Sequence, residues 1–382
     1  MTPITTDELN RALAAPALLI DLGKKIRECG FSSSAIAALL GYEGPSDGWI
    51  EKTGWFSLVW QAPVKPSMLS VLTQLIALGR NVPTAHYETC LPADLKAALE
   101  RLGLIAYDTP GHVACRVEIV EFDSCLCMSD KLFEHRDGKF AVITDPNTVM
   151  PPHISSLQLL RATTVRPDFQ TLLDVGCGSG CLSVPKLDRY AMVVGIDVNP
   201  RAALFAQMNV FLNGQDATRA DFVCADCREY TSDRKFDHIL FNSPTELAYP
   251  AEGEPAGAGF TTGLGIPFVF DFLSNRVPLL ISPRGLCQVT MLLSIPLGQT
   301  LESVVRRLVD QSAGKLKVSL RTYPESPFSL SALAIVEGRV PRGSMLLRNP
   351  GDGRLLINHL RRSRVGQVLS VSLDIELASS AA

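Results

Sequence analysis

The sequence lacks a long hydrophobic run and a strong excess of charge of either sign. No apolar stretch approaches the roughly 18 residues that cross a bilayer, so we expect no membrane partner. Asp7, Glu8 and Arg11 precede the first apolar run, which is not the pattern of a secretory signal. The formal net charge of −3 disfavours bulk electrostatic binding to nucleic acid. We therefore predict a cytoplasmic protein and do not expect nucleic acid as its partner.

A recognisable set of metal ligands is also missing, although the chain contains 10 cysteines. Cys125 and Cys127 form one close pair, and Cys224 and Cys227 form another. A zinc site needs further ligands, and no second pair at the usual spacing accompanies either of these. We predict no metal, and thiols that are reduced and mostly buried.

Length and composition favour two folded domains with a sizeable core. The chain has 382 residues, of which 46% are hydrophobic and 20% are charged. Pro146, Pro151 and Pro152 mark the best candidate for a boundary between them. The predicted divisions are an N-terminal domain over 1–145, a second domain over 146–340 and a C-terminal extension, with a β-hairpin, over 341–382.

The N-terminal region has the pattern of helices followed by short strands. Apolar residues recur at helical spacing over 7–40 and 66–104, and a strand follows over 112–122. This order is typical of a winged helix, but the helix over 92–102 balances its acidic and basic residues, unlike a helix that reads DNA. We therefore predict a winged-helix-like domain that packs against the rest, covers a substrate or forms a homodimer.

All three tryptophans, Trp49, Trp55 and Trp60, fall within residues 42–62. Two interpretations remain open for this segment. It either packs aromatic rings onto the helices or contributes to a substrate pocket or a dimer contact.

The most informative stretch is Leu172-Leu-Asp-Val-Gly-Cys-Gly-Ser-Gly180. A short buried strand runs directly into three glycines at alternate positions. Glycine accepts positive φ and has no side chain to block a ligand, so such a turn lets the backbone pass close to one. A strand, a glycine turn and a helix together form a nucleotide-binding arrangement in open α/β sheets.

A second acid strengthens this interpretation. The segment Met192-Val-Val-Gly-Ile-Asp197 is continuous and β-branched, as buried parallel strands are. Asp197 stands at its end, where a carboxylate is placed to accept hydrogen bonds from both hydroxyls of a ribose. Further strands are predicted over 221–224 and 238–241, the latter running into Asn242-Ser-Pro-Thr245.

The run from Asp174 to Gly180, together with Asp197, resembles the first two motifs of class I S-adenosylmethionine (SAM)-dependent methyltransferases. The likeness continues through Asp197-Val-Asn-Pro-Arg-Ala-Ala and Phe236-Asp-His-Ile-Leu-Phe-Asn-Ser-Pro244. It is similar to the subgroup that contains release-factor glutamine and ribosomal guanine methyltransferases, and covers roughly residues 145–340. The resemblance implies an α/β, Rossmann-like domain with a seven-stranded, mostly parallel sheet, closed by an antiparallel pair over 315–323 and 330–337.

The resemblance also implies a cofactor, SAM, and its ligands. Asp174 and the backbone of the three glycines would hold the methionine part. Asp197 would bind the ribose hydroxyls, Asp226 the adenine amine, and Asn242 would lie between cofactor and acceptor. The cofactor-binding residues implied in this way are Asp174, Gly176, Gly178, Gly180, Asp197, Asp226 and Asn242.

The stretch Asn242-Ser-Pro-Thr departs from the family pattern, which is Asn-Pro-Pro followed by Tyr or Phe. In the family, the Asn side chain and a prolyl-held carbonyl accept hydrogen bonds from a planar amide or aryl amine and aim its lone pair at the methyl group. This chain keeps Asn242 and Pro244 as catalytic candidates. Ser243 and Thr245 replace the first proline and the ring, and become candidate substrate contacts.

Three further residues are candidates near the acceptor. Glu246 follows directly and is either a base, a ligand for an ammonium group or a solvated loop acid. Tyr249 lies in a glycine-rich loop that has the composition of a lid. His153 precedes the helix that leads to the glycine turn, and is either an ordinary linker residue or a ligand-facing one.

We predict an enzyme that methylates a nitrogen atom of a small molecule, because the family's proline and ring are missing. The alternatives are a protein glutamine, an rRNA base or a small-molecule oxygen as acceptor. Two other classes remain: an oxidoreductase that uses NAD, and a regulator that binds DNA through the winged helix. Arginines gather over residues 338–382, where they form either a solvated surface or a contact to an anionic substrate or RNA.

Overall fold

The computed structural model describes residues 3–136, 139–142, 145, 147–244, 266–341, 344, 346 and 353–378. Thr245, Glu246 and Tyr249 lie outside the described residues, so their predicted roles stay predictions. The chain forms two compact units. The first unit is Met1–Leu157 with Cys177–Ala225, and the second is Gln158–Gly176 with Asp226–Ala382. The predicted division into three parts remains a prediction.

Seven strands form one mixed sheet in the order β10-β9-β8-β11-β12-β14-β13. Strands β10 and β9, β11 and β8, and β11 and β12 pair in parallel, whereas β14 is antiparallel to both β12 and β13. The predicted α/β class and seven-stranded sheet are thereby confirmed. The strands are β8 (Thr171–Val175), β9 (Met192–Asp197), β10 (Ala220–Cys224), β11 (Phe236–Asn242), β12 (Ile281–Pro296), β13 (Leu316–Tyr323) and β14 (Val365–Leu377).

The predicted closing pair of strands is wrong in its second member. The segment Ala332–Glu337 is a helix, α13, which Ser331 caps through its side chain and Gly338 ends at φ +71°. The strand that pairs with β13 is β14, from the segment predicted as a separate C-terminal hairpin. Because β14 lies between β12 and β13, the end of the chain completes the sheet rather than extending it.

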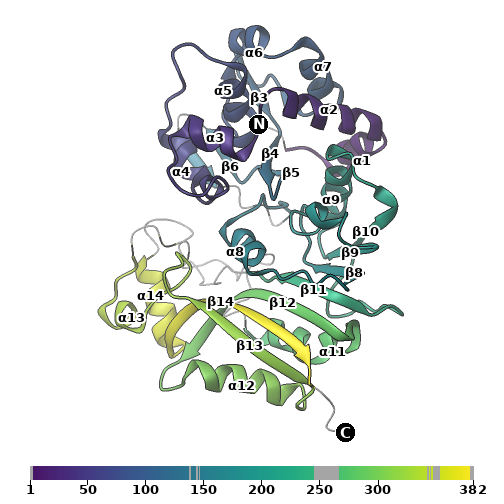
Figure 1. Ribbon diagram of the computed structural model, residues 1–382. Coiled ribbons are helices and arrows are strands. Elements are labelled where there is room, and N and C mark those ends of the chain that lie inside the picture. The colour runs from purple at the N-terminus through teal and green to yellow at the C-terminus, as the bar shows by residue number, and fades with distance from the viewer. Residues whose placement is uncertain are drawn as a thin grey trace. The chain divides into compact units, whose positions relative to one another are not determined.

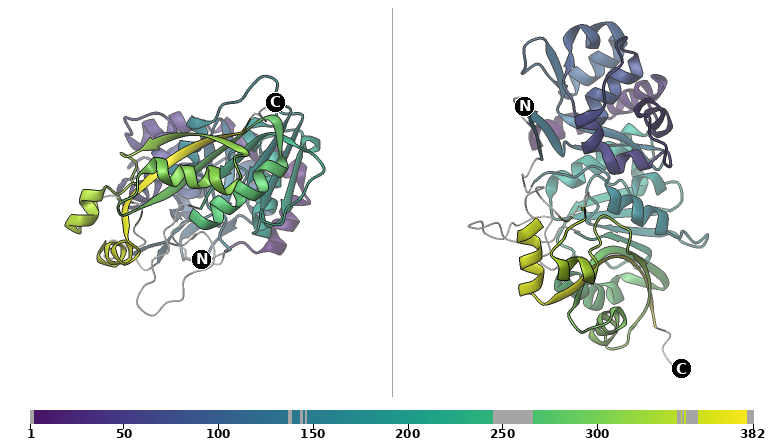
Figure 2. Two further views of the ribbon diagram at one scale, coloured as in Figure 1. Left: turned by 90° about the horizontal axis from the view of Figure 1, so that it is seen from below. Right: turned by 90° about the vertical axis from the view of Figure 1, so that its left-hand side faces the viewer.

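Helices cover both faces of the sheet in the second unit (Figures 1 and 2). On one side, Gln158 of α8 accepts a hydrogen bond from Ser370 of β14 at 2.8 Å, and Gln288 of β12 donates to the Ala162 carbonyl at 3.0 Å. On the other side, α12 packs on β13 and on the π-helical turn η5. The helices are α8 (Ile154–Ala162), α10 (Ile266–Asp271), η5 (Phe272–Arg276), α11 (Val277–Leu280), α12 (Leu301–Gln311), α13 (Ala332–Glu337) and α14 (Gly353–Arg362).

The side chains of two of the described C-terminal arginines, Arg339 and Arg361, have local partners. Arg361 of α14 donates to the carbonyls of Ile335 and Val336 at the end of α13. Arg339 pairs with Glu337. A cation at a helix C-terminus satisfies its last carbonyls, so these two side chains act within the fold.

The first unit begins with helices that start and end at typical capping residues. Thr5 and Glu8 form a capping box at α1, Ser32 caps α3, and Gly41 ends α3 at φ +67°. The elements before β8 are α1 (Thr6–Leu13), α2 (Pro16–Glu28), α3 (Ser33–Leu40), η1 (Gly48–Lys52), α4 (Thr53–Val59), α5 (Met68–Leu72), η2 (Thr73–Ala77), β1 (Val82–Pro83), α6 (Thr84–Cys90), α7 (Ala93–Arg101), β2 (Ile105–Ala106), β3 (His112–Cys115), β4 (Val117–Phe122), β5 (Cys125–Asp130), β6 (Phe133–Arg136) and β7 (Lys139–Val142).

The single strand predicted over 112–122 is wrong, because it breaks at Arg116. Strand β3 joins β1 and β2 in a three-stranded sheet, while β4 pairs with β5 in a separate two-stranded sheet. At the break, the Arg116 amide donates to the Leu104 carbonyl at 2.8 Å, and its guanidinium binds Glu8 and the Gly103 carbonyl. Helices α5 to α7 with the β1-β3-β2 sheet have the element order of a winged helix, and that assignment remains a prediction.

The three tryptophans have different surroundings. Trp49 is fully buried, and the Trp60 indole donates to the Leu39 carbonyl at 3.2 Å. Trp55 is 57% exposed and shares one face of α4 with the exposed Leu58 and Val59. Trp49 and Trp60 therefore pack within the fold, as the first interpretation holds. A dimer contact at Trp55 stays a prediction.

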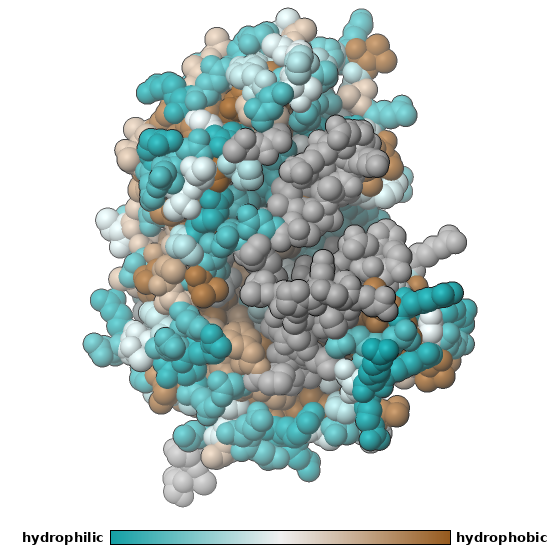
Figure 3. Space-filling model, turned by 180° about the vertical axis from the view of Figure 1, so that it is seen from behind, coloured by the Kyte–Doolittle hydropathy of each residue, from teal (hydrophilic) through white to brown (hydrophobic). Residues whose placement is uncertain are grey.

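On the face shown in Figure 3, hydrophilic and hydrophobic residues are interspersed over the described surface. Scattered apolar side chains of this kind are normal for a folded surface. Among the described residues, no helix is both long enough and apolar enough to cross a membrane.

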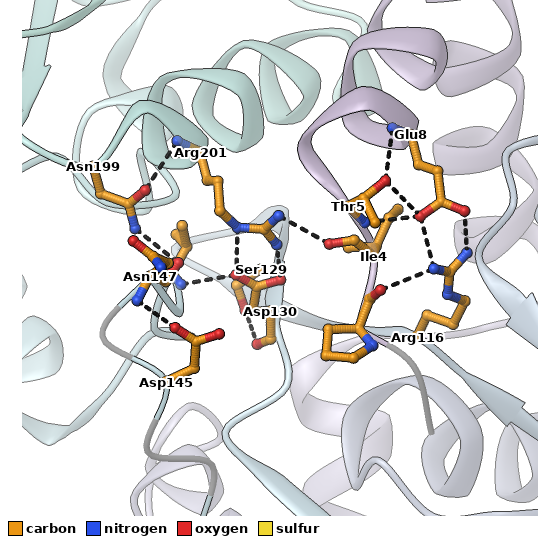
Figure 4. A network of polar contacts seen from close by, with 12 residues as sticks. Ile4, Thr5, Glu8, Arg116, Ser129, Asp130, Asp145, Asn147, Asn199 and Arg201 are labelled. Carbon is orange, nitrogen blue, oxygen red and sulfur yellow. Dashed lines mark hydrogen bonds and ion pairs between the residues drawn. The ribbon is translucent and has the colours of Figure 1, made fainter.

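A polar network fastens the start of the chain within the first unit (Figure 4). Arg201 of α9 (Pro200–Leu212) forms a two-pronged ion pair with Asp130 of β5 and donates to the Ile4 carbonyl at 2.9 Å. Nearby, the guanidinium of Arg116 holds the pKa of Glu8 at about 2 through their hydrogen bond. Strand β5 and helix α9 are thus joined by a largely buried ion pair.

Candidate functional site

The glycine turn follows β8 as predicted. Gly176, Gly178 and Gly180 have φ values of +64°, +52° and +73°, the left-handed region that glycine enters most easily. The Cys177 amide donates to the Ile196 carbonyl of β9 at 3.0 Å. The α-helix expected after the turn is absent from this described stretch, which instead contains one 3₁₀ turn, η3 (Val184–Lys186). Pro185 lies in that turn, where it lacks an N–H for a longer helix.

The last two glycines of the turn serve different purposes. A Cβ added at Gly178 would meet no atom within 4 Å, so the backbone there borders open space. A Cβ at Gly180 would lie 2.9 Å from Val184 Cγ2 and 3.1 Å from Ala206 Cβ of α9. Gly178 therefore leaves room for a ligand, whereas Gly180 allows α9 to pack against the turn.

This difference predicts separate effects for two alanine substitutions. In Gly180→Ala, the positive φ costs about 1–2 kcal/mol and the clash of the new Cβ costs about 1–3 kcal/mol. The free energy of unfolding is expected to fall by the sum of the two. Gly178→Ala carries only the φ term of about 1–2 kcal/mol. Chemical denaturation of both variants measures the order, and a greater loss in Gly178→Ala would contradict it.

Asp197 links the turn to the start of α9. One carboxylate oxygen accepts the Gly178 amide at 2.9 Å, and the other accepts the Asn199 amide at 2.9 Å. Burial raises the pKa of Asp197, against the lowering effect of these amide donors. Each carboxylate oxygen has a second lone pair, so the side chain can hold the turn and still accept hydrogen bonds from two hydroxyls.

Asp174 and Asn242 belong to the second unit, on neighbouring strands. Strands β8 and β11 pair in parallel up to Val175 and Phe241, so Gly176 and Asn242 are the next residues at the same end of both strands. Asp174 is 1% exposed. The ring of Phe241 packs edge-on against Phe272 at 5.3 Å between centroids, which supports this end of β11 from η5.

Ser243 continues the ladder beyond Asn242. Its amide donates to the Thr290 carbonyl of β12 at 3.0 Å, a bond that a proline at this position could not make. The side chain is 2% exposed, and its hydroxyl has no hydrogen-bond partner among the described residues. Pro244 is half-buried beside it.

Asp226 and His153 have local partners that sequence reasoning did not foresee. The Asp226 carboxylate accepts from the amide and guanidinium of Arg228, which lowers its pKa. His153 precedes α8, where its carbonyl accepts the Leu157 amide at 3.0 Å, and burial lowers its pKa to about 4. His153 is therefore neutral at pH 7. The adenine and substrate roles of these residues stay predictions.

Sequence reasoning missed Asn209, which contacts the turn from α9. Its side-chain amide donates to the Ser179 carbonyl at 2.8 Å. Asparagine is a poor former of helices, so its place inside α9, three residues before the helix ends, was the one hint that the sequence offered, and it did not indicate a partner. No group of metal-ligating residues is found among the described residues.

Comparisons with known proteins bear on this site. Residues 154–250 match the family model "Methyltransferase small domain". A release factor glutamine methyltransferase of Geobacter sulfurreducens is 30% identical over 43% of this chain and 60% of its own length. A ribosomal RNA large subunit methyltransferase G of Shewanella amazonensis is 30% identical over 23% of this chain and 24% of its own.

A third relative is named for methyl transfer to oxygen. A ubiquinone biosynthesis O-methyltransferase of Leptothrix cholodnii is 37% identical over 20% of this chain and 34% of its own length. The chain thus spans at most about 60% of these relatives. The matches confirm the predicted resemblance to the class I SAM-dependent methyltransferases. The segment that matches the methyltransferase small domain is residues 154–250.

Proposed function

We propose that this protein is a SAM-dependent methyltransferase that acts on a nitrogen atom. One observation carries the proposal: the parallel pairing of β8 and β11 brings the glycine turn and Asn242 out at the same end of adjacent strands. Ligands of open α/β sheets bind beyond the carboxyl ends of the strands. A cofactor-binding turn and an acceptor-binding amide on adjacent strand ends suit the transfer of a group between two ligands.

The residues of this chain fit SAM. Gly178 borders open space at a positive φ, so a ligand can approach the backbone. The Asp197 carboxylate is fixed by two amides and has lone pairs left for a ribose diol. When bound, SAM supplies an electrophilic methyl group on a sulfonium.

The contribution of the protein is orientation. The side-chain carbonyl of Asn242 accepts a hydrogen bond from the acceptor N–H, which points the nitrogen lone pair along the line of transfer. Pro244 has a fixed φ and restricts the backbone of Ser243 before it. Holding two reactants in line supplies up to about 7–11 kcal/mol of the barrier in favourable cases, so no strong acid or base is needed for a nitrogen that is neutral when it binds.

For the acceptor, we propose a small molecule with a nitrogen nucleophile. The support is that Ser243 stands where the related enzymes have proline, and that Thr245 stands where they have an aromatic ring to stack on a flat amide or base. A protein glutamine is the second candidate, because the relative that shares the longest segment with this chain among those named is a release factor glutamine methyltransferase. The relatives named for proteins and RNA also give no support to our expectation that nucleic acid is not a partner.

Transfer of a labelled methyl group from SAM to separated pools tests the acceptor. The full chain is incubated with a small-molecule amine library, with release factor and with ribosomal RNA at two salt concentrations. Label in the amine pool alone is expected. Label in release factor or in RNA, the latter declining with salt, would replace the small-molecule acceptor. Thermal stabilisation by NAD but not by S-adenosylhomocysteine (SAH) would overturn the methyltransferase proposal itself.

Ser243→Ala separates acceptor binding from folding. A buried hydroxyl without a partner costs about 1–3 kcal/mol in the free protein, so its removal is expected to leave the unfolding free energy unchanged or raised. If the hydroxyl contacts the acceptor, KM for the acceptor rises. The control is Ser282→Ala, which breaks a hydrogen bond to Asp237 of 2.9 Å and is expected to lower stability without changing KM. Equal destabilisation in both variants would contradict the prediction.

A further inference from the structure

Two asparagines one turn apart, Asn209 near the end of α9 and Asn213 at its C-cap, satisfy the outer edge of strand β5. Asn213 accepts the Leu126 amide at 2.8 Å and donates to the Leu126 carbonyl at 2.8 Å. Asn209 does the same at Met128, with distances of 2.8 and 2.9 Å. Within the described parts of the chain, β5 has a strand partner only in β4, so these side-chain amides take the place of a third strand.

Of these two asparagines, Asn209 also reaches the glycine turn. Its amide nitrogen donates a second hydrogen bond to the Ser179 carbonyl at 2.8 Å. The Ser179 hydroxyl lies 3.1 Å from the sulfur of Cys127, which stands on β5 next to Met128. Asn209 and Ser179 are each 1% exposed. The oxygen and both hydrogens of the Asn209 amide therefore have partners, in a buried network that joins β5, α9 and the turn.

We propose that Asn209 is a positioning residue for the cofactor, and that through it the β4–β5 ribbon forms part of the cofactor site. Ser179 lies between Gly178 and Gly180. Because glycine can adopt many backbone conformations, the turn needs contacts that hold it in one of them. Fixing the Ser179 carbonyl from behind fixes the peptide plane that follows and, with Asp197, the direction of the turn's amides. This inference rests on the proposed use of SAM. It assigns to the N-terminal segment a role in cofactor binding that neither its winged-helix order nor the glycine motif implies.

Linkage gives the proposal a consequence that wild-type protein can test. If Asn209 stabilises the cofactor-bound turn, then cofactor binding stabilises the Asn209 contacts by the same free energy. The Met128 amide, which donates to Asn209, is then protected when SAH binds. The Leu126 amide, which donates to Asn213, is its matched control on the same strand.

The experiment combines variants with hydrogen exchange in the full chain. Asn209→Ala and Asn213→Ala each remove a paired contact to β5, and only the first removes the contact to Ser179. We expect Asn209→Ala to raise Kd for SAH about tenfold, within the usual range of coupling between sites. Asn213→Ala is expected to change Kd by less than about twofold. In wild type, SAH is expected to slow exchange at Met128 and leave Leu126 unchanged.

The possible outcomes distinguish a failure of this inference from a failure of the proposed function. Wild-type protein that does not bind SAH would overturn the proposed function. Wild-type binding with equal Kd values in the two variants, or equal protection of the two amides, would overturn the role of Asn209 alone. If Asn209→Ala does not fold, the exchange measurement on wild type decides.

Discussion

Asp197→Asn is expected to raise Kd for SAH about a hundredfold, or about 2.7 kcal/mol. The substitution keeps one acceptor oxygen and replaces the other with a donor. The donor then opposes either the Gly178 amide or the Asn199 amide, both of which now donate to the carboxylate at 2.9 Å. Hydrogen bonds to a charged partner contribute about 1.5–3 kcal/mol each, so losing the charge weakens the hold on a ribose diol as well as on the turn. Isothermal titration with SAH measures the change.

Asp216→Asn provides the control for that titration. Asp216 caps the short turn η4 (Ala217–Arg219) and binds Thr218, so its carboxylate is structural and exposed. We expect its variant to bind SAH as wild type does. Wild-type affinity in Asp197→Asn would remove the ribose role from Asp197 and leave it as a structural link between the turn and α9.

The sheet was predictable where each strand has a local signature. The apolar stretches of β8 and β9, the acid at Asp197 and the glycines of the turn are properties of adjacent residues. The closing pair was not, because the apolar stretch at 332–337 is too short to separate strand from helix by periodicity. Its cap at Ser331 and its stop at Gly338 were the better signals. The alternation in the tail predicted a strand correctly but carried no information on its partners.

In the candidate site, too, residues in local motifs were predictable and residues that meet across the fold were not. The motif residues at the turn and at Asn242 were predicted from neighbours in the sequence. Asn209 and Ser179 meet across 30 positions, and Asn209 and Met128 across 81. Such contacts depend on how α9 packs against β5, for which no local pattern exists. The break at Arg116 has the same cause, because its guanidinium pairs with Glu8 108 positions away.

Asn242→Ala is expected to reduce kcat about a hundredfold or more while leaving Kd for SAH within about twofold, because the side chain orients the acceptor rather than holding the cofactor. Val175 and Phe241 are in register on β8 and β11, so Asn242 and Gly176 are the next residues at the same end of the two strands. Single-turnover transfer at saturating acceptor measures the chemical step, and titration with SAH measures the cofactor.

The surface variant Asn275→Ala is the control for Asn242→Ala, since Asn275 is exposed and its side chain donates to Asp271, four positions away. It should retain both the rate and the affinity. The comparison with Asp197→Asn then carries the argument. If Asp197 binds the ribose, its variant raises Kd for SAH. If Asn242 orients the acceptor nitrogen, its variant lowers kcat instead. Equal loss of SAH affinity in Asp197→Asn and Asn242→Ala would mean that β11 ends in a cofactor ligand, and the acceptor would then have to be held by residues other than Asn242.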